Sequence, residues 1–268
     1  MPSNLIIGNS SQISKFLSDS EFKKIDSRNF SFSQIDREWN TAILAFGENR
    51  KFLPSFSLYE EINVKLTLDT VKFLLDKCRK IIVFSTCELW NKCSGPIDLS
   101  TPFNFYDTFY ARSKFMMTEE ILNHPNLYPN VCVIYPFNFN STFRSEDFLF
   151  GKVFNSILTK KKISIGDTYY YRDIFHPIFL AREIPNLNSH TLIGSGRLTY
   201  INDFIRELYA YFDLNYEELV EENLNNFKEY DLKYEYYLRS NRPKYEYKSL
   251  FLDTVRDIKS KMNQIVST

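Results

Sequence analysis

The feature that most constrains the fold is an alternation of short apolar runs with longer amphipathic segments. The runs NLIIG, EFKKID, TAILAFG, KIIVFST and NVCVIYP each have the length of a strand. Between them, apolar residues recur at helical spacing in NSSQISKFL, in INVKLTLDTVKFLLDKC and from about residue 106 to 122. Strands that alternate with helices predict right-handed crossovers and a mostly parallel sheet covered on both faces.

The pattern loosens after residue 140. FGKVFNSILTK, TYINDFIRELYAYF and KSLFLDTVRDIKSKM have helical spacing, and KKISIG has the length of a short strand. We therefore expect an α/β protein with a Rossmann-like, doubly wound parallel sheet over residues 1–140, helices on both faces, and segments that return to it later. Residues 141–268 are expected to form mainly a small C-terminal α/β lobe.

Composition excludes several classes of partner. The 33 lysines and arginines balance the 33 aspartates and glutamates, so the net charge is zero and no global attraction to nucleic acid or membranes is expected. The apolar runs are far shorter than the ~20 residues that span a bilayer, and the N-terminus lacks a signal-peptide pattern. The four cysteines form no Cys-x-x-Cys pair and the three histidines are scattered, so we expect no metal site. A cytoplasmic protein with reduced thiols is the expectation.

Ligands of an open parallel sheet bind at the carboxyl ends of its strands. The residues expected at such ends are Gly8, Asp26, Ala45, Phe46, Gly47, Ser85, Thr86 and Tyr135. Gly8 and the expected helix after it suit a pyrophosphate, although Ser11 and Ser14 replace two glycines of a Gly-x-x-Gly-x-x-Gly fingerprint. Asp26 lies 18 residues beyond Gly8, where a carboxylate binds an adenosine ribose; a solvated strand-end aspartate is the alternative. Arg28 beside it would instead favour a 2′-phosphate.

The stretch FYARSKFMMTEEIL places Tyr110 and Lys114 four residues apart, on one face of a helix. A free phenol has a pKa of ~10, and a neighbouring ammonium lowers that pKa, which suits proton exchange at neutral pH. A chance match among 18 tyrosines is the alternative, but no other Tyr-x-x-x-Lys occurs in the sequence.

These motifs occur in one order along the chain, together with NVKLT, VFSTCELW, VIYPFNF, IGDTYYYRDIFHP and LIGSGR. The order resembles the extended short-chain dehydrogenase/reductase family, and within it the NAD(P)-dependent nucleotide-sugar epimerases, dehydratases and 4-ketoreductases. The resemblance covers roughly residues 4–200. Its most specific parts are a Ser/Thr-rich strand end followed 24 residues later by Tyr-x-x-Ser-Lys, and the pair Arg172-Asp173.

The resemblance implies a dinucleotide-binding domain followed by a substrate-binding lobe, with Thr86, Tyr110 and Lys114 as the catalytic set. Thr86 would orient the substrate oxygen, Tyr110 would exchange a proton with it, and Lys114 would also bond the nicotinamide ribose. The residues implied for NADPH or NADH are Gly8, Ser10, Ser11, Gln12, Ile13, Asp26, Arg28, Ala45, Phe46, Gly47, Asn63, Ser85, Lys114, Tyr135 and Pro136. Those implied for a nucleotide-diphosphate sugar are Cys87, Glu88, Asn138 and Arg172.

Some residues depart from the family pattern. Cys87 stands where the family's dehydratases have an aspartate, so elimination of water is not expected. Two alternatives remain for Cys87. Its thiol could serve as a catalytic acid, as a cysteine at this position does in some epimerases of the family, or it could be a small buried residue at a strand end. Tyr135 replaces an arginine, which leaves Asn138 to bond the diphosphate or the sugar. For Arg172, a surface ion pair with Asp173 is the alternative.

A nucleotide-sugar 4-ketoreductase is therefore the expected function. An epimerase of the same fold is one alternative, and a non-catalytic cofactor- or nucleotide-binding homologue is another. Loss of two glycines favours a reductase, because a reductase must exchange its cofactor in every turnover. His176, Arg239 and Arg242 are weaker candidates to assist the substrate. For Met116 and Met117, a homodimer contact and an intramolecular core are the two alternatives.

Overall fold

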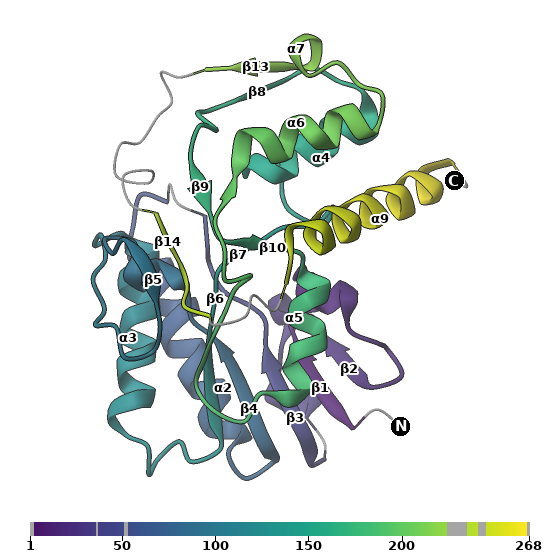
Figure 1. The fold of residues 1–268 in the computed structure, drawn as a ribbon. Helices are drawn as coiled ribbons and strands as arrows, with labels where there is room; N and C mark the ends of the chain where they lie inside the picture. Colours follow the sequence, from purple (N-terminus) through teal and green to yellow (C-terminus); the bar gives the residue numbers. More distant parts are fainter. Residues whose placement is uncertain (1–2, 36, 51–52, 224–234, 241–244, 267–268) are drawn as a thin grey trace. The chain divides into compact units, whose positions relative to one another are not determined.

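The computed structural model describes residues 3–35, 37–50, 53–223, 235–240 and 245–266, which form two compact units (Figure 1). The first unit comprises Met1–Trp90, Pro102–Pro136 and Leu180–Ile193. The second comprises Asn91–Thr101, Phe137–Phe179 and Gly194–Thr268. The chain passes from the first unit to the second after Pro136, and the later segment Leu180–Ile193 belongs to the first unit.

A parallel sheet forms the centre of the first unit, and it confirms the predicted α/β class. The described residues give it six strands in the order β11-β6-β4-β3-β1-β2. The strands are β1 (Asn4–Ile7), β2 (Phe22–Ile25), β3 (Trp39–Leu44), β4 (Cys78–Phe84), β6 (Val131–Pro136) and β11 (Thr191–Ile193). Leu5, Ile6 and Ile7 are fully buried, as expected for a strand covered on both faces, which explains why β1 is apolar after Asn4.

Two predicted helices of the first unit are confirmed and lie side by side (Figure 1). The helical elements of this unit are η1 (Ile13–Phe16), η2 (Ser27–Asn29), η3 (Phe32–Gln34), α1 (Ser57–Tyr59), η4 (Glu60–Leu66), α2 (Thr67–Leu74), η5 (Cys87–Trp90), α3 (Phe109–Asn123) and η6 (Ile184–Asn186). One predicted helix comprises α1, the π-helical η4 and α2, and the other is α3. The chain passes from the second unit to the first within α5 (Pro177–Glu183).

The helix predicted directly after β1 is wrong, because only the 3₁₀ turn η1 forms there. The hydroxyl of Ser14 donates to the backbone carbonyls of Asn9 (2.5 Å) and Ser11 (2.8 Å). Such side-chain bonds to nearby carbonyls compete with the helical hydrogen-bond pattern. The chain leaves the turn at Leu17 in an extended conformation and enters β2 five residues later.

The strand order places a topological switch point at β1. Ile7 pairs with Ile25 of β2 on one side and with Leu44 of β3 on the other. The connections that leave β1 and β3 therefore run apart at their carboxyl ends. In doubly wound sheets this divergence forms the ligand-binding crevice.

The second unit consists of short strand pairs and helices. Its strands are β5 (Gly95–Ile97), β7 (Asn138–Phe139), β8 (Ile163–Ile165), β9 (Tyr171–Arg172), β10 (Ile174–Phe175), β12 (Thr199–Tyr200), β13 (Val220–Glu222) and β14 (Tyr236–Leu238). They pair as β5–β14, β7–β10, β8–β13 and β9–β12. The helices are α4 (Leu149–Thr159), α6 (Ile201–Tyr211), α7 (Tyr216–Leu219) and α9 (Tyr247–Val266). The predicted helices at α4, α6 and α9 are confirmed.

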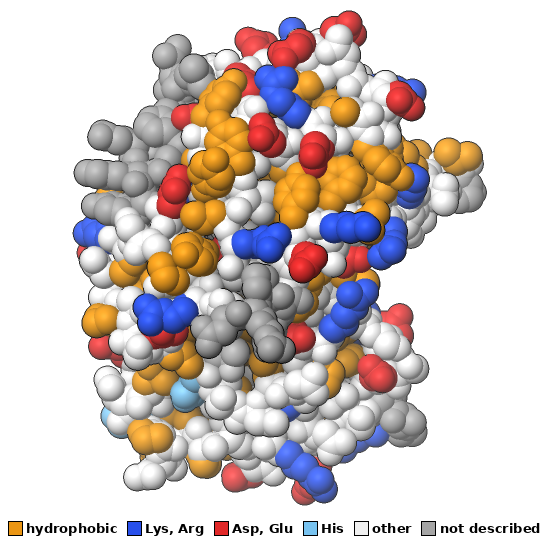
Figure 2. Space-filling model, viewed as in Figure 1, with side chains coloured by type: hydrophobic (Ala, Val, Ile, Leu, Met, Phe, Trp, Pro, Cys, Tyr) orange, Lys and Arg blue, Asp and Glu red, His pale blue; other side chains and the backbone are white. Residues whose placement is uncertain are grey.

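Basic and acidic side chains are interspersed over the face of the molecule shown in Figure 2. No large area of one sign occupies that face, in keeping with equal numbers of positive and negative residues. Within the described ranges, no helix has both the length and the apolar character to cross a bilayer.

Candidate functional site

The helix α3 carries Lys114 to the carboxyl end of β4, and Tyr110 lies one helical turn earlier on the same helix. Its N-cap is Thr108, whose hydroxyl accepts a hydrogen bond from the backbone N–H of Ala111 at 3.2 Å. Lys114 is 5% exposed, and its ammonium donates to the carbonyl oxygen of Phe84 at 2.8 Å. Phe84 is the last residue of β4, so the charge lies at a strand end.

Burial sets the acidity of Lys114. Desolvation lowers the pKa of its ammonium from 10.5 to about 8. A titratable group perturbed in this way at a strand end is typical of functional sites, because folding free energy alone would favour an apolar residue there.

Thr86 follows the same strand end. Its hydroxyl oxygen accepts the backbone N–H of Glu88 at 3.1 Å and fixes the start of η5. Tyr110 is half-buried one helical turn before Lys114. One strand end and one helix thus carry all three predicted catalytic residues, whose roles stay predictions.

Cys87 and Glu88 lie in η5, directly beyond Thr86. Cys87 is 3% exposed, which agrees with the alternative that it is a small buried residue. Glu88 is half-buried. A contact of either residue with substrate stays a prediction.

Asn63 has a role that sequence reasoning missed. Its side-chain amide is fully buried in η4 and donates to the carbonyl of Glu48 (2.9 Å) and to the hydroxyl of Ser113 (2.9 Å). Its oxygen accepts the backbone N–H of Glu48 at 2.8 Å. These bonds fasten the loop after β3 to α3, beside Lys114. The signal was present in the sequence as a polar residue at a position that the helical pattern buries.

The loop after β3 also passes close to Lys114. A Cβ atom at Gly47 would lie 3.0 Å from the side-chain oxygen of Asn63 and 3.3 Å from the Lys114 ammonium. A larger residue at Gly47 would therefore press on both groups. Ala45 and Phe46 precede Gly47 in this loop and are half-buried.

Gly8 directly follows β1, at the topological switch point. Its φ of +117° favours glycine, and a Cβ atom there would lie 2.7 Å from the carbonyl oxygen of Ala45. The backbone of Gly8 thus packs closely against the backbone that follows β3. In doubly wound sheets a dinucleotide binds at the carboxyl ends of the strands beside such a point.

The segment after Gly8 departs from a dinucleotide-binding helix. The backbone N–H of Ser11 donates to the carbonyl of Gly8 at 3.0 Å, and Ser10 is exposed. Gln12 and Ile13 are buried, so these two side chains are directed into the protein. Their contact with a cofactor stays a prediction, and one turn of 3₁₀ helix supplies few aligned N–H groups.

Asp26 and Arg28 follow the end of β2 and bind each other. The carboxylate of Asp26 accepts the backbone N–H of Arg28 at 3.0 Å and its guanidinium at 3.2 Å. The backbone and side-chain hydrogen bonds of Arg28 lower the pKa of Asp26. Both proposed determinants of cofactor choice thus lie together, next to β1.

Tyr135 and Pro136 end β6 and are buried. Tyr135 is 1% exposed and packs edge-to-face against Trp90 with ring centroids 5.3 Å apart. Burial raises the pKa of Tyr135. Ser85, at the neighbouring strand end, contacts Thr118 of α3 through their hydroxyl oxygens at 2.8 Å. These side chains contribute to the core, and their contact with a cofactor stays a prediction.

Asn138 and Arg172 belong to the second unit. Asn138 is exposed in β7. Arg172 donates to the carbonyl of Tyr171 at 2.7 Å, and its guanidinium lies 4.7 Å from the ring centroid of Tyr170. The surface ion pair with Asp173 is contradicted, because Asp173 is fully buried.

The carboxylate of Asp173 instead holds a turn of its own unit. It accepts the backbone N–H and the hydroxyl of Ser195 at 2.7 Å each, and the backbone N–H groups of Gly196 and Leu238 at 3.1 Å. Burial raises the pKa of Asp173, and these hydrogen bonds oppose the rise.

The weaker candidates that the structure describes bind acidic residues of the protein itself. Arg239 binds Asp98 at 3.2 Å, and Arg242 lies outside the described residues. His176 is buried and binds Asp257, a residue of α9.

Comparison with known proteins gives structural matches alone. No protein-family model matches the chain, and no curated protein does. The structure of RMD from Pseudomonas aeruginosa complexed with NADPH matches with a TM-score of 0.76 and 15% identity, over 96% of this chain and 99% of that one. DesIV, a dTDP-glucose 4,6-dehydratase from Streptomyces venezuelae with NAD bound, matches with a TM-score of 0.78 and 16% identity, over 97% and 98%.

A third structure is the UDP-glucuronic acid 4-epimerase from Bacillus cereus in complex with NAD. It matches with a TM-score of 0.75 and 15% identity, over 97% of both chains. At such identities the likeness concerns the fold, which the chain shares with these three proteins over nearly their whole length. The chain therefore has the fold of the extended short-chain dehydrogenase/reductases, as its motif order predicts.

Proposed function

We propose that this protein reduces a nucleotide-linked 4-keto sugar with NADPH or NADH. The observation that carries the proposal is the buried ammonium of Lys114 at the carboxyl end of β4. Tyr110 precedes it by one helical turn, and Thr86 follows the same strand. A phenol, a hydroxyl and a buried cation at one strand end suit acid catalysis on a carbonyl group.

A reduced nicotinamide, when bound, supplies the hydride that carbonyl reduction requires. Gly8 and Gly47 would admit the dinucleotide, Asp26 or Arg28 would contact its adenosine ribose, and Lys114 would bond the nicotinamide ribose.

The chain's own residues act on the carbonyl oxygen. Thr86 orients this oxygen with its hydroxyl, and Tyr110 transfers its phenolic proton to it. The carbon–oxygen double bond becomes an alcohol, and solvent reprotonates the phenolate. Lys114 keeps its positive charge near the phenolate that forms, which stabilises that negative charge.

The second unit supplies two of the proposed substrate contacts. Arg172 has a planar guanidinium fork that suits a diphosphate, and Asn138 has an exposed amide for the diphosphate or the sugar. Solved structures of this fold contain nucleotide sugars, including MoeE5 with UDP-glucuronic acid and NAD at 13% identity and a TM-score of 0.78. This content supports a nucleotide sugar as the substrate class.

The short turn η1 favours reduction over epimerisation. An epimerase keeps its cofactor, whereas a reductase releases it after each hydride transfer. A 3₁₀ turn of four residues offers a weaker dipole to a pyrophosphate than a full helix does. The resulting lower affinity for the dinucleotide suits a cofactor that is released after each turnover.

One experiment tests the proposal and separates it from the alternative. The protein as isolated is denatured and its released nucleotides are measured, and the intact protein is then assayed for NADPH or NADH oxidation with a nucleotide-linked 4-keto sugar. Oxidation that depends on the keto sugar, with no retained cofactor, supports a reductase. Retained oxidised cofactor without net oxidation of added NADPH or NADH identifies an epimerase. Binding of neither cofactor at millimolar concentration would overturn both.

A further inference from the structure

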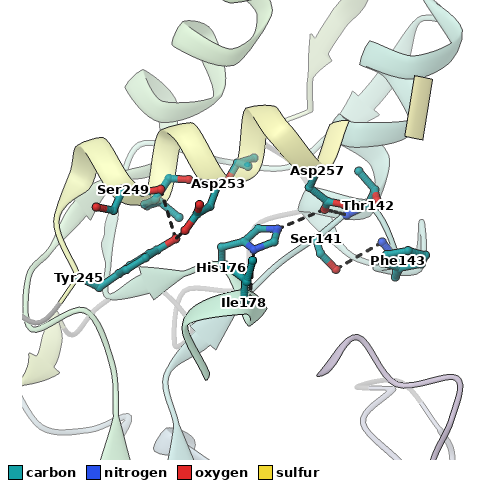
Figure 3. A network of polar contacts seen from close by, with 11 residues as sticks. Ser141, Thr142, Phe143, His176, Ile178, Tyr245, Ser249, Asp253 and Asp257 are labelled. Carbon is teal, nitrogen blue, oxygen red and sulfur yellow. Dashed lines mark hydrogen bonds and ion pairs between the residues drawn. The ribbon is translucent and has the colours of Figure 1, made fainter. Parts of the chain in front are cut away.

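A single carboxylate of the C-terminal helix joins two separate segments of the second unit (Figure 3). Asp257 lies on α9, and its side chain accepts the backbone N–H of Thr142 at 2.7 Å and the hydroxyl of Thr142 at 3.0 Å. The same carboxylate lies 3.2 Å from Nε2 of His176. The three groups belong to parts of the sequence that are far apart.

The hydrogen bonds of His176 define its role in this network. Its Nδ1 accepts the backbone N–H of Ile178 at 3.3 Å, so the proton lies on Nε2, which donates to Asp257. His176 is 1% exposed. With both ring nitrogens occupied inside the protein, His176 does not act as a general base on a bound molecule, and the arrangement is not a hydrolase triad.

Both joined segments follow strands that carry proposed substrate contacts. β7 and β10 pair in parallel, with Asn138 opposite Ile174, and the backbone N–H of Asn140 donates to the carbonyl of Phe175 at 3.2 Å. Thr142 follows β7 by three residues, and His176 directly follows β10. Arg172 ends β9, two residues before β10 begins. Asp257 thus bridges the downstream ends of the strands next to Asn138 and Arg172.

A pair of strands of two residues each has little stability of its own. The distance between β7 and β10 therefore depends on the contacts of the segments that follow them. Three hydrogen bonds to the Asp257 carboxylate join these segments, and hydrogen bonds to a charged acceptor are stronger than those to a neutral one.

We propose that Asp257 is a positioning residue for the nucleotide substrate. From α9 it holds the ends of β7 and β10 in register, so that Asn138 and Arg172 keep the separation that a nucleotide diphosphate requires. This inference rests on the proposed function. It assigns the C-terminal helix a part in substrate affinity and none in cofactor affinity.

The same helix offers a matched control. Asp253 lies one turn before Asp257 and is 6% exposed. Its carboxylate accepts the hydroxyl of Tyr245 at 2.8 Å and the guanidinium of Arg256 at 3.0 Å. Asp253→Asn therefore alters a second buried carboxylate on α9, one that bonds Tyr245 and Arg256.

The test compares the wild type, Asp257→Asn and Asp253→Asn by calorimetry with UDP, dTDP and GDP, and by fluorescence with NADPH. In Asp257→Asn an amide N–H₂ group replaces one carboxylate oxygen, and it cannot accept the hydrogen bond which that oxygen accepted. The dissociation constant of the variant for the preferred nucleotide is expected to rise roughly tenfold, with NADPH binding unchanged. Asp253→Asn should lower the unfolding free energy and leave both affinities at the wild-type value. Thr142→Ser, which keeps the hydroxyl, should retain most of the nucleotide affinity.

Unchanged nucleotide affinity in Asp257→Asn would overturn this inference and leave the proposed function standing. Equal losses in Asp257→Asn and Asp253→Asn would also overturn it, because packing of the helix would then explain both. Absence of binding of all three nucleotides to the wild type would overturn the proposed function and the inference together.

Discussion

The ammonium of Lys114 donates a hydrogen bond to the carbonyl oxygen of Phe84 across 2.8 Å, which fastens α3 to the carboxyl end of β4. A second link joins the same elements, with the hydroxyl oxygens of Ser85 and Thr118 2.8 Å apart. The second link involves no charge. The attachment of α3 to the end of β4 therefore does not depend on Lys114 alone, and burial of its ammonium costs desolvation free energy.

Replacement of Lys114 by methionine should abolish reduction and change the pH dependence of stability. The unfolded chain holds this lysine's proton up to its pKa of 10.5, whereas the folded protein releases it near its pKa of about 8. Between these values the unfolded state binds more protons, so wild-type stability gains as pH rises. Lys114→Met lacks that gain. Its unfolding free energy relative to the wild type should fall by on the order of 2–3 kcal/mol between about pH 7 and pH 10.

Urea unfolding of both proteins at the two pH values measures this difference. The comparison cancels other groups that titrate equally in both proteins. A difference that stays constant over the range would mean that Lys114 has an ordinary pKa in the folded protein.

Substitution of Gly8 by alanine should prevent cofactor binding. The new Cβ atom would lie 2.7 Å from the Ala45 carbonyl oxygen at a φ of +117°, so we expect a loss of stability of ~2–4 kcal/mol. Gly95→Ala is the control, because Gly95 also has a positive φ (+83°) but no atom within 4 Å of the new Cβ. It should lose about 1–2 kcal/mol and bind NADPH normally. Equal NADPH binding in both variants would place the cofactor away from Gly8.

Removal of the Asn63 amide should loosen the loop over Lys114. Asn63→Ala leaves the backbone of Glu48 and the hydroxyl of Ser113 without the three hydrogen bonds that they share with Asn63. We expect a loss of ~2–4 kcal/mol in the free energy of unfolding, measured by urea denaturation. Asn63→Asp keeps an acceptor for Glu48 but no donor, and should lose nearly as much. A loss below ~1 kcal/mol in both variants would show that water replaces the amide.

The pair Asp26 and Arg28 should set the choice between NADH and NADPH. Asp26→Ala removes a carboxylate that repels a 2′-phosphate, so NADPH should gain relative to NADH. Arg28→Ala removes a cation and should shift the preference toward NADH. Dissociation constants for both cofactors in each variant measure these shifts. If neither variant alters the ratio, the adenosine end lies elsewhere.

The first unit could be predicted because the central parts of its strands are short apolar runs, as the fully buried Ile6 and Ile43 illustrate. Such a run fits a strand buried on both faces, and its short length distinguishes it from a helix. The strand ends then followed, and with them Gly8, Asp26, Gly47 and Thr86. The prediction that Tyr110 and Lys114 lie on one face of a helix followed from their spacing of four residues alone.

The failures have a different physical origin. The turn at η1 depends on one hydroxyl, that of Ser14, which competes with the helix for carbonyl acceptors. Asn63 could be noticed as a polar residue at a buried helix position, but its partners Glu48 and Ser113 come from segments that meet only in the folded protein. The strand pairs of the second unit, such as β7 with β10, are too short to show a period. Asp257 therefore could not be linked to Thr142 and His176 before their positions were known.

The most direct test of the central claim is the turnover of Tyr110→Phe with NADPH and a nucleotide-linked 4-keto sugar, followed by nicotinamide absorbance. The substitution removes one hydroxyl and keeps the ring, so the unfolding free energy should change by about 1 kcal/mol or less. Tyr106→Phe, on the segment that precedes α3, serves as the matched control and should retain wild-type turnover. The account predicts a ~10²–10⁴-fold fall in turnover for Tyr110→Phe with unchanged NADPH affinity. Full activity in that variant would contradict the assignment of Tyr110 as the proton donor.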